Sequence, residues 1–527
     1  MNRERDEEAE YLATFGYKQE LNRSLGRFSA FAAGFSFLSI LTGATMLFGF
    51  GFGFGGPAFF WSMPVVFLGQ FPVALCFAEL ASKYPLAGGL YQWVKNIASE
   101  GPGWLAGWIL AIAVIPFVAG PALSLQIVLP QLWSGFQVFG TAADVGSYAT
   151  PGGAENAVLL GSVLVALTTI VNIVGIRLMA FLNNIGVFVE LIGCVLLIAL
   201  LFGHTQRGPE VTLATNGTGA GHPAGYIGAF LVAGLFAVNI LYGFDTAGTL
   251  AEETTNPRKF APREIVRALT VSTLLGALLV LAADMAVPDI FRDSTIQQIS
   301  TLGLPYVLKS ILGDGLSTVF LACVVLSICV CTLTVQTGGI RLIFSMARDG
   351  KLPASHALSK VNPRTRSMPV PAIVLAVLVF GLLLVNLGNT QIITAVGGLA
   401  AVLVYLAYTI VTVSLLHARL RGKWPTPDHG PYFNMGRWGL PANVVAVVFQ
   451  LFMIVNLAWP RPEIYGAGAW YLTWAGVLFT GVIVLAGGLY YLLAHRRPGK
   501  PTALPEHRAT TAASAENTTE TPDLSTR

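Results

Sequence analysis

Long apolar runs separated by short polar segments dominate this chain. Twelve of them have the roughly 20 apolar residues that a ~30 Å hydrocarbon core requires. They lie near 28–55, 58–81, 103–131, 155–176, 184–203, 226–250, 265–287, 314–342, 370–387, 391–416, 441–459 and 470–494. This pattern predicts an all-α integral membrane protein with twelve transmembrane helices.

Two of the predicted spans carry polar or flexible residues where a span should be driest. The run 226–250 contains Gly243 and Asp245, and an ionised carboxylate at the bilayer centre costs roughly 2.5 to 3.5 kcal/mol on insertion scales. The first run contains Gly43 at a corresponding place. Irregular backbone inside a membrane is tolerated only where it meets protein, water or a ligand. We therefore expect both helices to unwind, the first between residues 41 and 45.

The spacing of these two breaks predicts the architecture. They fall in the first and sixth spans, and broken helices that meet near the bilayer midplane are how many secondary transporters hold a substrate. We expect a five-plus-five inverted repeat, made of residues 28–203 and 226–416, followed by two extra C-terminal helices in 441–494. Residues 28–494 would then form one transporter domain.

Composition and charge agree with a membrane protein. Only 11% of residues are charged and the mean hydropathy is +0.66, whereas about a quarter of the residues in soluble domains are charged. Of the 31 Lys and Arg residues, 27 fall in the segments that would be cytosolic if both termini are, and four fall outside. This asymmetry follows the positive-inside rule and predicts a multi-pass protein of the plasma membrane. Such sorting of charge favours membrane orientation and not nucleic-acid binding.

The two ends of the chain lack apolar spans. Residues 1–27 are acidic and then mixed in charge, without the pattern of a signal peptide, and are expected to form a cytosolic N-terminal tail. Residues 495–527 are rich in Thr, Ala, Glu and Pro without apolar periodicity. That composition predicts a disordered cytosolic tail.

Residues suited to enzyme chemistry or to metal binding do not gather in this sequence. The five cysteines lie inside apolar runs without metal-ligand spacing, so we expect neither a disulfide nor a metal site. No Walker-type phosphate loop and no Gly-x-Ser-x-Gly is present, and no cofactor is expected. A polytopic membrane enzyme, or a nutrient sensor built on a transporter fold, remains the alternative from a different class.

Four stretches together resemble a known superfamily. They are AELASKYPLAGGLYQWV (78–94), NIVGIRLMAFLNNIGVFVELIG (172–193), GFDTAGTLAEETTNPRKFAPREI (243–265) and RLIFSMARDGKLP (341–353). In this order and on these spans, the chain resembles the amino acid, polyamine and organocation (APC) superfamily, particularly its branch for amino acids, GABA and choline. The resemblance runs from about Phe15 to Tyr491. It implies a secondary active transporter that imports an amino acid or related amine by alternating access.

The substrate is expected between the two breaks. The resemblance implies that the acidic residue of the Gly-Phe-Asp sequence, Asp245, lies beside the substrate, and the alternative is that it pins the broken helix. Freed N–H groups at a helix start attract a substrate carboxylate, and Tyr242 and Phe244 can cover a bound amine by cation–π contact. The candidate substrate-binding residues are Thr42, Gly43, Ala44, Thr45, Tyr242, Gly243, Phe244 and Asp245.

We expect a proton to be the coupling ion. A carboxyl group held away from water is protonated more easily than one in water, so Glu190 and Asp245 are the candidates for proton coupling. The resemblance places Glu190 where proton-driven relatives carry a lysine, beside the first broken span, and the alternative is a packing hydrogen bond between helices. A sodium-coupled or exchange transporter of GABA, choline or polyamine also remains open, with Ser327, Thr332 and Thr334 as hydroxyls for a sodium site.

Charged residues crowd two of the predicted cytosolic loops. Glu252, Arg341 and Arg348 are expected to form an ionic inner gate, since packed ionic contacts can have two discrete arrangements. Glu79 is a further candidate partner, or its side chain snorkels to the surface. The alternative for the whole group is a solvated positive-inside loop. The expected partners are thus a small-molecule substrate, a proton and the lipid bilayer, and the sequence makes no prediction of the oligomeric state.

Overall fold

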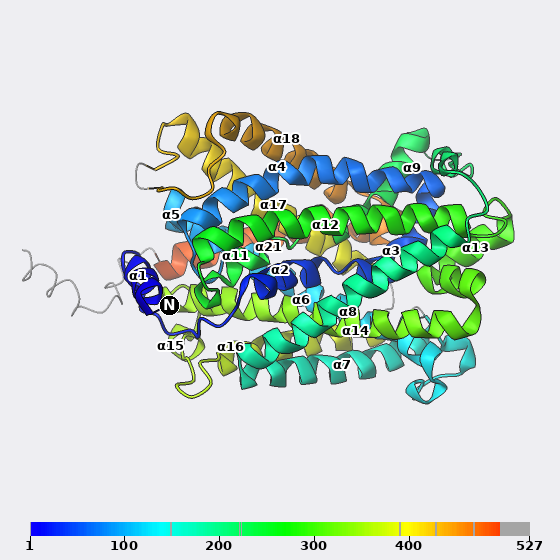
Figure 1. Ribbon diagram of the computed structural model, residues 1–527, viewed down its shortest axis with the longest axis horizontal. Coiled ribbons are helices and arrows are strands. Elements are labelled where there is room, and N and C mark those ends of the chain that lie inside the picture. Colours follow the sequence, from blue (N-terminus) through cyan, green and yellow to red (C-terminus); the bar gives the residue numbers. More distant parts are fainter. Residues whose placement is uncertain are drawn as a thin grey trace, which may run out of the picture.

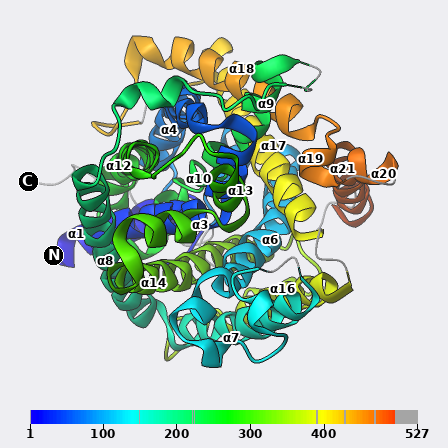
Figure 2. The same ribbon diagram turned by 90° about the vertical axis from the view of Figure 1, so that its right-hand side faces the viewer.

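The computed structural model describes residues 2–147, 150–220, 222, 224–388, 392–426, 429–466 and 470–495. Within these ranges, every regular element is a helix. The long helices run along one axis of the molecule and form a bundle, seen from the side in Figure 1 and end-on in Figure 2. The all-α prediction is confirmed. The predicted C-terminal tail lies outside the described residues, except for its first residue.

The long apolar helices correspond to the predicted spans. In the described part of the chain, ten helical stretches are long and apolar enough to cross a membrane, and two more, Gly225–Ile240 and Pro369–Val385, are apolar but shorter. The helices of these stretches are α2 (Arg27–Leu38), α3 (Ile40–Gly55), α4 (Ser62–Lys83), α6 (Glu100–Leu132), α7 (Pro151–Val174), α8 (Ile176–Gly203), α9 (Gly225–Ala233), α10 (Leu235–Ile240), α12 (Pro257–Ala286), α14 (Leu304–Arg348), α16 (Pro369–Gly388), α17 (Ile392–Leu420), α18 (Gly439–Ala458) and α21 (Ala475–His495).

Short helices connect or cap the long ones. They are α1 (Asn2–Ala13), α5 (Leu90–Ile97), α11 (Thr246–Thr249), α13 (Asp293–Leu302), α15 (Ser355–Leu358), α19 (Pro462–Tyr465), α20 (Trp470–Thr473) and the 3-10 helices η1 (Pro57–Trp61), η2 (Ser134–Phe136), η3 (Ala142–Asp144), η4 (Pro209–Leu213), η5 (Ala251–Glu253) and η6 (Gly436–Trp438). In Figure 1, α1, α5 and α15 lie at the left end of the molecule, and α9 and α13 lie at the right end.

Several helices extend beyond their apolar cores. The helix α12 begins at Pro257, eight residues before the apolar run that predicts it, and α14 continues through Arg348. The polar residues of these extensions end the hydropathy signal without ending the backbone hydrogen bonding, so apolar length sets only a lower limit on helix length.

Burial divides the helices into an interior and a periphery. In an 18-residue apolar segment of the stretch Arg27–Gly55, 78% is buried inside the protein. In the corresponding segment of Ala475–Ala494, only 6% is buried. Figure 2 shows α3 and α10 near the middle of the bundle and α18 and α21 at its edge. The exposed faces of the peripheral helices are apolar, as lipid contact requires. The two helices with predicted breaks therefore belong to the interior.

Candidate substrate site and inner gate

The second break lies where the sequence predicts it. The helix α10 ends at Ile240 and α11 begins at Thr246, and between them Gly243 has φ +89, a conformation that glycine adopts without a steric cost. The N–H of Gly243 donates to the Tyr408 hydroxyl at 2.9 Å. The freed backbone donor is thus satisfied by a side chain from α17, and the predicted break at Gly243 is confirmed.

The first break lies earlier than predicted, and the prediction of unwinding between residues 41 and 45 is wrong. Those residues are helical in α3, and the break is the single residue Ser39, with φ 26 and ψ 92. The carboxylate of Glu190, on α8, explains this position. Its Oε1 accepts from the Ser39 hydroxyl at 3.0 Å and from the N–H of Leu41 at 3.3 Å. A carboxylate from a neighbouring helix therefore caps the start of α3.

The two glycines that mark the predicted breaks have different tasks. The N–H of Gly43 donates to the Ser39 carbonyl at 2.9 Å, as in an ordinary first helical turn. A Cβ at Gly43 would lie 2.5 Å from Cγ1 of Ile240, and a Cβ at Gly243 would overlap the ring of Phe37. Both glycines thus allow the two broken helices to touch at their breaks, and only Gly243 also supplies a special backbone conformation.

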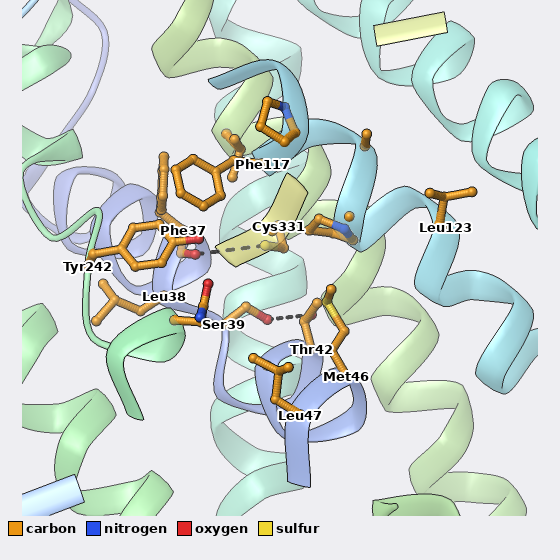
Figure 3. Close-up of a pocket in the computed structure, with 18 of the residues that line it drawn as sticks. Phe37, Leu38, Ser39, Thr42, Met46, Leu47, Phe117, Leu123, Tyr242 and Cys331 are labelled. Atoms are coloured by element: carbon orange, nitrogen blue, oxygen red, sulfur yellow. Dashed lines mark hydrogen bonds between the residues drawn. The ribbon is translucent and has the colours of Figure 1, made fainter. Parts of the chain in front are cut away.

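A cavity of about 100 Å³ lies beside the first break; we call it the larger cavity. A water needs roughly 10–15 Å³ of such volume, so there is room for a small ligand. Figure 3 shows the rings of Phe37, Phe117 and Tyr242 gathered on one side and Ser39 and Thr42 on the other. The hydroxyl oxygens of Ser39 and Thr42 lie 2.7 Å apart. The lining is mostly apolar with a few polar groups, as is usual for small-molecule sites.

A smaller cavity of about 30 Å³ lies beside the second break. Asp245, Thr246, Thr249 and Tyr408 line it, together with the three aromatic residues that also line the larger cavity. The ring centroids of Phe117 and Tyr242 lie 4.5 Å apart, and those of Phe37 and Tyr242 lie 6.0 Å apart. We call Phe37, Phe117 and Tyr242 the aromatic partition, because they lie against both cavities.

The candidate substrate residues divide among these surroundings. Thr42 and Gly43 line the larger cavity, Gly243 and Asp245 line the smaller one, and Tyr242 lines both. Ala44, Thr45 and Phe244 do not line either cavity. Phe244 instead packs against Phe77 and Tyr408, with ring centroids 5.9 and 5.6 Å apart. Phe244 is therefore not placed to cover a ligand in either cavity, whereas Tyr242 lines both, and its contact with an amine stays a prediction.

Asp245 is buried and tied to α17. Its side chain is 7% exposed, and its Oδ1 accepts a hydrogen bond from the Tyr408 hydroxyl. This contact fits the interpretation that Asp245 pins the broken helix, and its place in the smaller cavity fits a role in substrate or proton handling. The sequence did offer a signal for Tyr408, since a phenol hydroxyl in the middle of an apolar span needs a partner.

Other residues of the site carry weaker sequence signals. Asn239 lines the larger cavity one turn before the second break, as a polar residue in an apolar run. Ser39 is a small hydroxyl residue of a common kind, and Phe117 is one aromatic residue among many. Sequence reasoning missed all three: Ser39 and Asn239 lie in the broken spans but outside the residues expected to unwind, and only the fold brings Phe117 to the breaks.

Glu190 lies beside the broken first span, as the resemblance implies. Its side chain is 1% exposed, and its Oε2 has no hydrogen-bond partner in the described part of the chain. Each of the three hydroxyls considered for sodium donates to a protein oxygen: Ser327 to the Cys323 carbonyl, Thr332 to the Ile328 carbonyl and Thr334 to Asn183 Oδ1.

The predicted inner gate is a set of buried ion pairs. Both terminal nitrogens of Arg348 donate to Glu252, at 2.7 and 3.1 Å, and Arg341 donates to Glu253 at 2.9 and 3.1 Å. Glu252 is 0% exposed and Arg341 is 3% exposed. The alternative of a solvated loop is therefore wrong for these four residues, which we call the inner cluster.

The N-terminal segment closes over this cluster. The N–H groups of Ser24 and Leu25 donate to the carbonyl of Glu253, at 3.0 and 2.9 Å. The hydroxyl of Tyr17 donates to Asp349, at 2.7 Å, and Lys95 pairs with the same carboxylate at 2.6 Å. Burial, together with the negative charge of Asp349, raises the pKa of Tyr17 well above its usual value. Tyr17 is thus kept as a neutral donor.

Glu79, the fourth residue predicted for the inner gate, lies outside the inner cluster. Its side chain is 0% exposed, so it does not snorkel to the surface. Its Oε2 accepts from Arg419 and its Oε1 accepts from the N–H of Met435 at 3.3 Å. Glu79 therefore ties α4 to α17 and is not a partner of Glu252, Arg341 or Arg348. Sequence spacing gave no means to choose Arg419 among the many arginines of the segments predicted to be cytosolic.

Comparison with known proteins gives a consistent result. The family model described as amino acid permease matches residues 25–493. Amino-acid permease BAT1 of Arabidopsis thaliana is 28% identical over 92% of this chain and 94% of its own length. The branched-chain amino acid permease BcaP of Bacillus subtilis is 28% identical, covering 85% of this chain and 90% of its own length. The thiamine transporter thi9 of Schizosaccharomyces pombe is 26% identical, covering 91% and 85%. These matches confirm the resemblance drawn from the four stretches.

Proposed function

We propose that this chain, which belongs to the amino acid permease family, is a secondary active transporter that imports an amino acid or a related amine. It would act in the plasma membrane with both termini in the cytosol and with a five-plus-five inverted repeat followed by two further helices. The observation that carries the proposal is the contact between two broken helices at their breaks, with a small cavity beside each break. Such a midplane arrangement is how many secondary transporters hold their substrates.

The larger cavity suits a small zwitterion. The start of α3 lies at its edge, and a substrate carboxylate would share the partial positive charge of this helix start with the Glu190 cap. Tyr242 and Phe117 offer aromatic faces to an amine, a contact worth about 0.5 to 2 kcal/mol. The rest of the lining is apolar, which suits an aliphatic side chain. A substrate would then lie against the aromatic partition, between the larger cavity and the smaller one.

Alternating access would work through the two barriers on the cytosolic side of this cavity. The aromatic partition lies between the larger cavity and Asp245, and the inner cluster lies beyond it. With these ion pairs formed, the cavity would be closed to the cytosol. Opening would require the partition rings to move and the two buried ion pairs to separate, which is a switch between discrete packed states.

Proton coupling is supported by two buried carboxyl groups, one at each break. Glu190 caps α3 and Asp245 accepts from Tyr408, so protonation of either would change the contacts that hold a break in place. Sodium coupling and substrate exchange are the alternatives for energy coupling. GABA, choline and polyamines are alternative substrates, and the relative named as a thiamine transporter extends the range to larger organic cations.

Uptake into proteoliposomes that contain the purified protein tests this function. A thermal-shift panel of amino acids and amines first selects a ligand, because a compound that binds only the folded protein raises its stability. We expect that ligand to accumulate faster as the external pH falls, without sodium, and a protonophore to abolish the accumulation. Uptake that needs sodium and ignores the proton gradient would overturn the coupling. Binding without any uptake or exchange would favour the sensor interpretation.

A further inference from the structure

A third cavity lies away from the breaks, at the end of the molecule that we assign to the cytosol. Its volume is about 610 Å³, and it lies between the turn joining α7 and α8, the segment 364–366 and Asn22. We call it the basic cavity, because Arg177, Arg364 and Arg366 line it. No carboxylate is among its nine lining residues.

Among the residues that the structure describes, the three arginines have no partner for their charge. In the part of the chain that the structure describes, none of their guanidinium groups takes part in an ion pair or a hydrogen bond, and all three are exposed. This differs from Arg341 and Arg348, whose charges are neutralised by buried carboxylates. Three uncompensated positive charges around one hollow attract an anion, and arginine is the side chain best suited to bind phosphate oxygens.

The walls of the basic cavity are fixed by hydrogen bonds. The Ser367 hydroxyl donates to the carbonyl of Ile173 at 2.7 Å, which holds the segment before α16 against the end of α7. The N–H of Arg366 donates to the Asn362 carbonyl at 2.8 Å, and the N–H of Arg364 donates to Asn362 Oδ1 at 2.9 Å. The backbone that carries two of the three arginines is therefore a closed turn. The guanidinium groups of Arg364 and Arg366 therefore extend from a backbone whose conformation is fixed.

An apolar surface begins directly beside this cavity. Val174 and Leu178 line the cavity and are 51% and 37% exposed. Further along α8, Phe181 and Ile185 are 61% and 45% exposed. These helices belong to the stretches long and apolar enough to cross a membrane, so their exposed side chains would contact acyl chains. The basic cavity thus lies at the boundary between hydrocarbon and water.

We propose that the basic cavity binds the phosphate headgroup of an anionic phospholipid from the cytosolic leaflet. A free phosphate would contact only the arginines. The headgroup of a lipid would contact the arginines, and its acyl chains would contact the neighbouring apolar surface of α7 and α8. Basic pockets between transmembrane helices on the cytosolic side are known to suit such headgroups. Because the basic cavity is continuous with an apolar surface, we favour a lipid over a free phosphate as its ligand.

Native mass spectrometry of the full-length protein tests this proposal. The probes are phosphatidylglycerol and phosphatidylcholine with identical acyl chains, and inorganic phosphate. We expect wild-type protein to retain the anionic lipid with a preference of at least about tenfold. The variant Arg177→Gln/Arg364→Gln/Arg366→Gln should lose that preference. The matched variant Arg263→Gln/Arg421→Gln/Arg437→Gln removes the same charge from exposed arginines outside the cavity and should keep it.

Three outcomes would overturn the proposal. The first is an unchanged lipid preference in the cavity variant. The second is an equal loss in both triple variants, which would indicate general attraction to the positive end of the protein. The third is displacement of the lipid by millimolar inorganic phosphate, which would indicate a site for soluble anions. Should the cavity variant fail to fold, Arg364→Gln alone is measured in the same way and should lower the preference severalfold.

Discussion

The two helix breaks use the same pair of chemical groups from opposite sources. At the second break the broken helix supplies the carboxylate, Asp245, and a neighbouring helix supplies the hydroxyl, Tyr408. At the first break the broken helix supplies the hydroxyl, Ser39, and a neighbouring helix supplies the carboxylate, Glu190. Each break is therefore stabilised by a bond to a helix outside it, and protonation of either carboxyl would loosen that bond.

The breaks also differ in how the backbone is interrupted. At the second break several residues leave the helix around Gly243, which has φ +89. At the first break only Ser39 departs from the helix, and the next turn begins at once under the cap from Glu190. One break is thus set by a local backbone preference and the other by a contact between distant parts of the chain.

The largest effect should come from removing the glycines. Gly243→Leu and Gly43→Leu should abolish uptake, because either side chain would overlap the other broken helix. Gly381→Leu is the control, since a Cβ at Gly381, on α16, meets open space. Uptake by proteoliposomes and the yield of folded protein are the measurements. Wild-type uptake in both glycine variants would contradict the site.

A pair of rescues sharpens the difference between the glycines. Gly43→Ala acts only by contact with the side chain of Ile240, so adding Ile240→Ala should restore much of the uptake. Gly243→Ala also forces a residue with a Cβ into a left-handed conformation, which costs roughly 1–2 kcal/mol. Adding Phe37→Ala should therefore not restore it. If the second substitution restored uptake at both positions, the two breaks would not differ in the backbone conformation that they require.

The next effect concerns energy coupling. Glu190→Gln keeps an oxygen that can accept from Ser39 and Leu41, but it cannot exchange a proton. We expect this variant to exchange substrate across the membrane and to lose accumulation driven by a pH gradient. Asp245→Asn should lose both activities, because Asp245 lies in the smaller cavity, where a substrate amine would lose its negative partner. Accumulation that survives in Glu190→Gln would assign Glu190 to packing alone.

The contrast explains what the sequence could predict. The spans and the second break follow from local signals, namely apolar length and a glycine beside a carboxylate. The position of the first break depends on Glu190, about 150 residues away in the chain, so the glycine at position 43 misled the prediction. Pairing was also hard to predict: Glu252 and Arg348 meet as expected, but Glu79 pairs with Arg419, since charge and topology leave several partners open.

A smaller effect is expected at the end of the molecule that we assign to the cytosol, where the two broken helices are joined through Leu25 and Glu253. Breaking one partner of a buried ion pair leaves a charge that costs about 3–5 kcal/mol. Arg348→Gln should therefore favour the inward-open state, and Glu252→Gln/Arg348→Gln should favour it less. A cysteine introduced at Thr249, in the smaller cavity, reports this opening through its labelling rate. Equal labelling in all variants would make the inner cluster a static support.

The smallest effect should follow from removing the hydroxyls. The Tyr408 hydroxyl accepts from Gly243 and donates to Asp245, so Tyr408→Phe leaves two buried groups unpaired. Ser39→Ala costs less at the first break, because the N–H of Leu41 still donates to Glu190. An unpaired buried polar group costs about 1–3 kcal/mol, so Tyr408→Phe should lower the thermal stability more than Ser39→Ala does.

Tyr408→Phe should also raise the KM for uptake severalfold, since the unwound segment would be less well ordered. Tyr405→Phe, on the same helix, is the control for loss of a hydroxyl, because the Tyr405 hydroxyl accepts from Gln70. If Ser39→Ala is the more damaging change, the first break depends on Ser39 itself more than on the carboxylate cap.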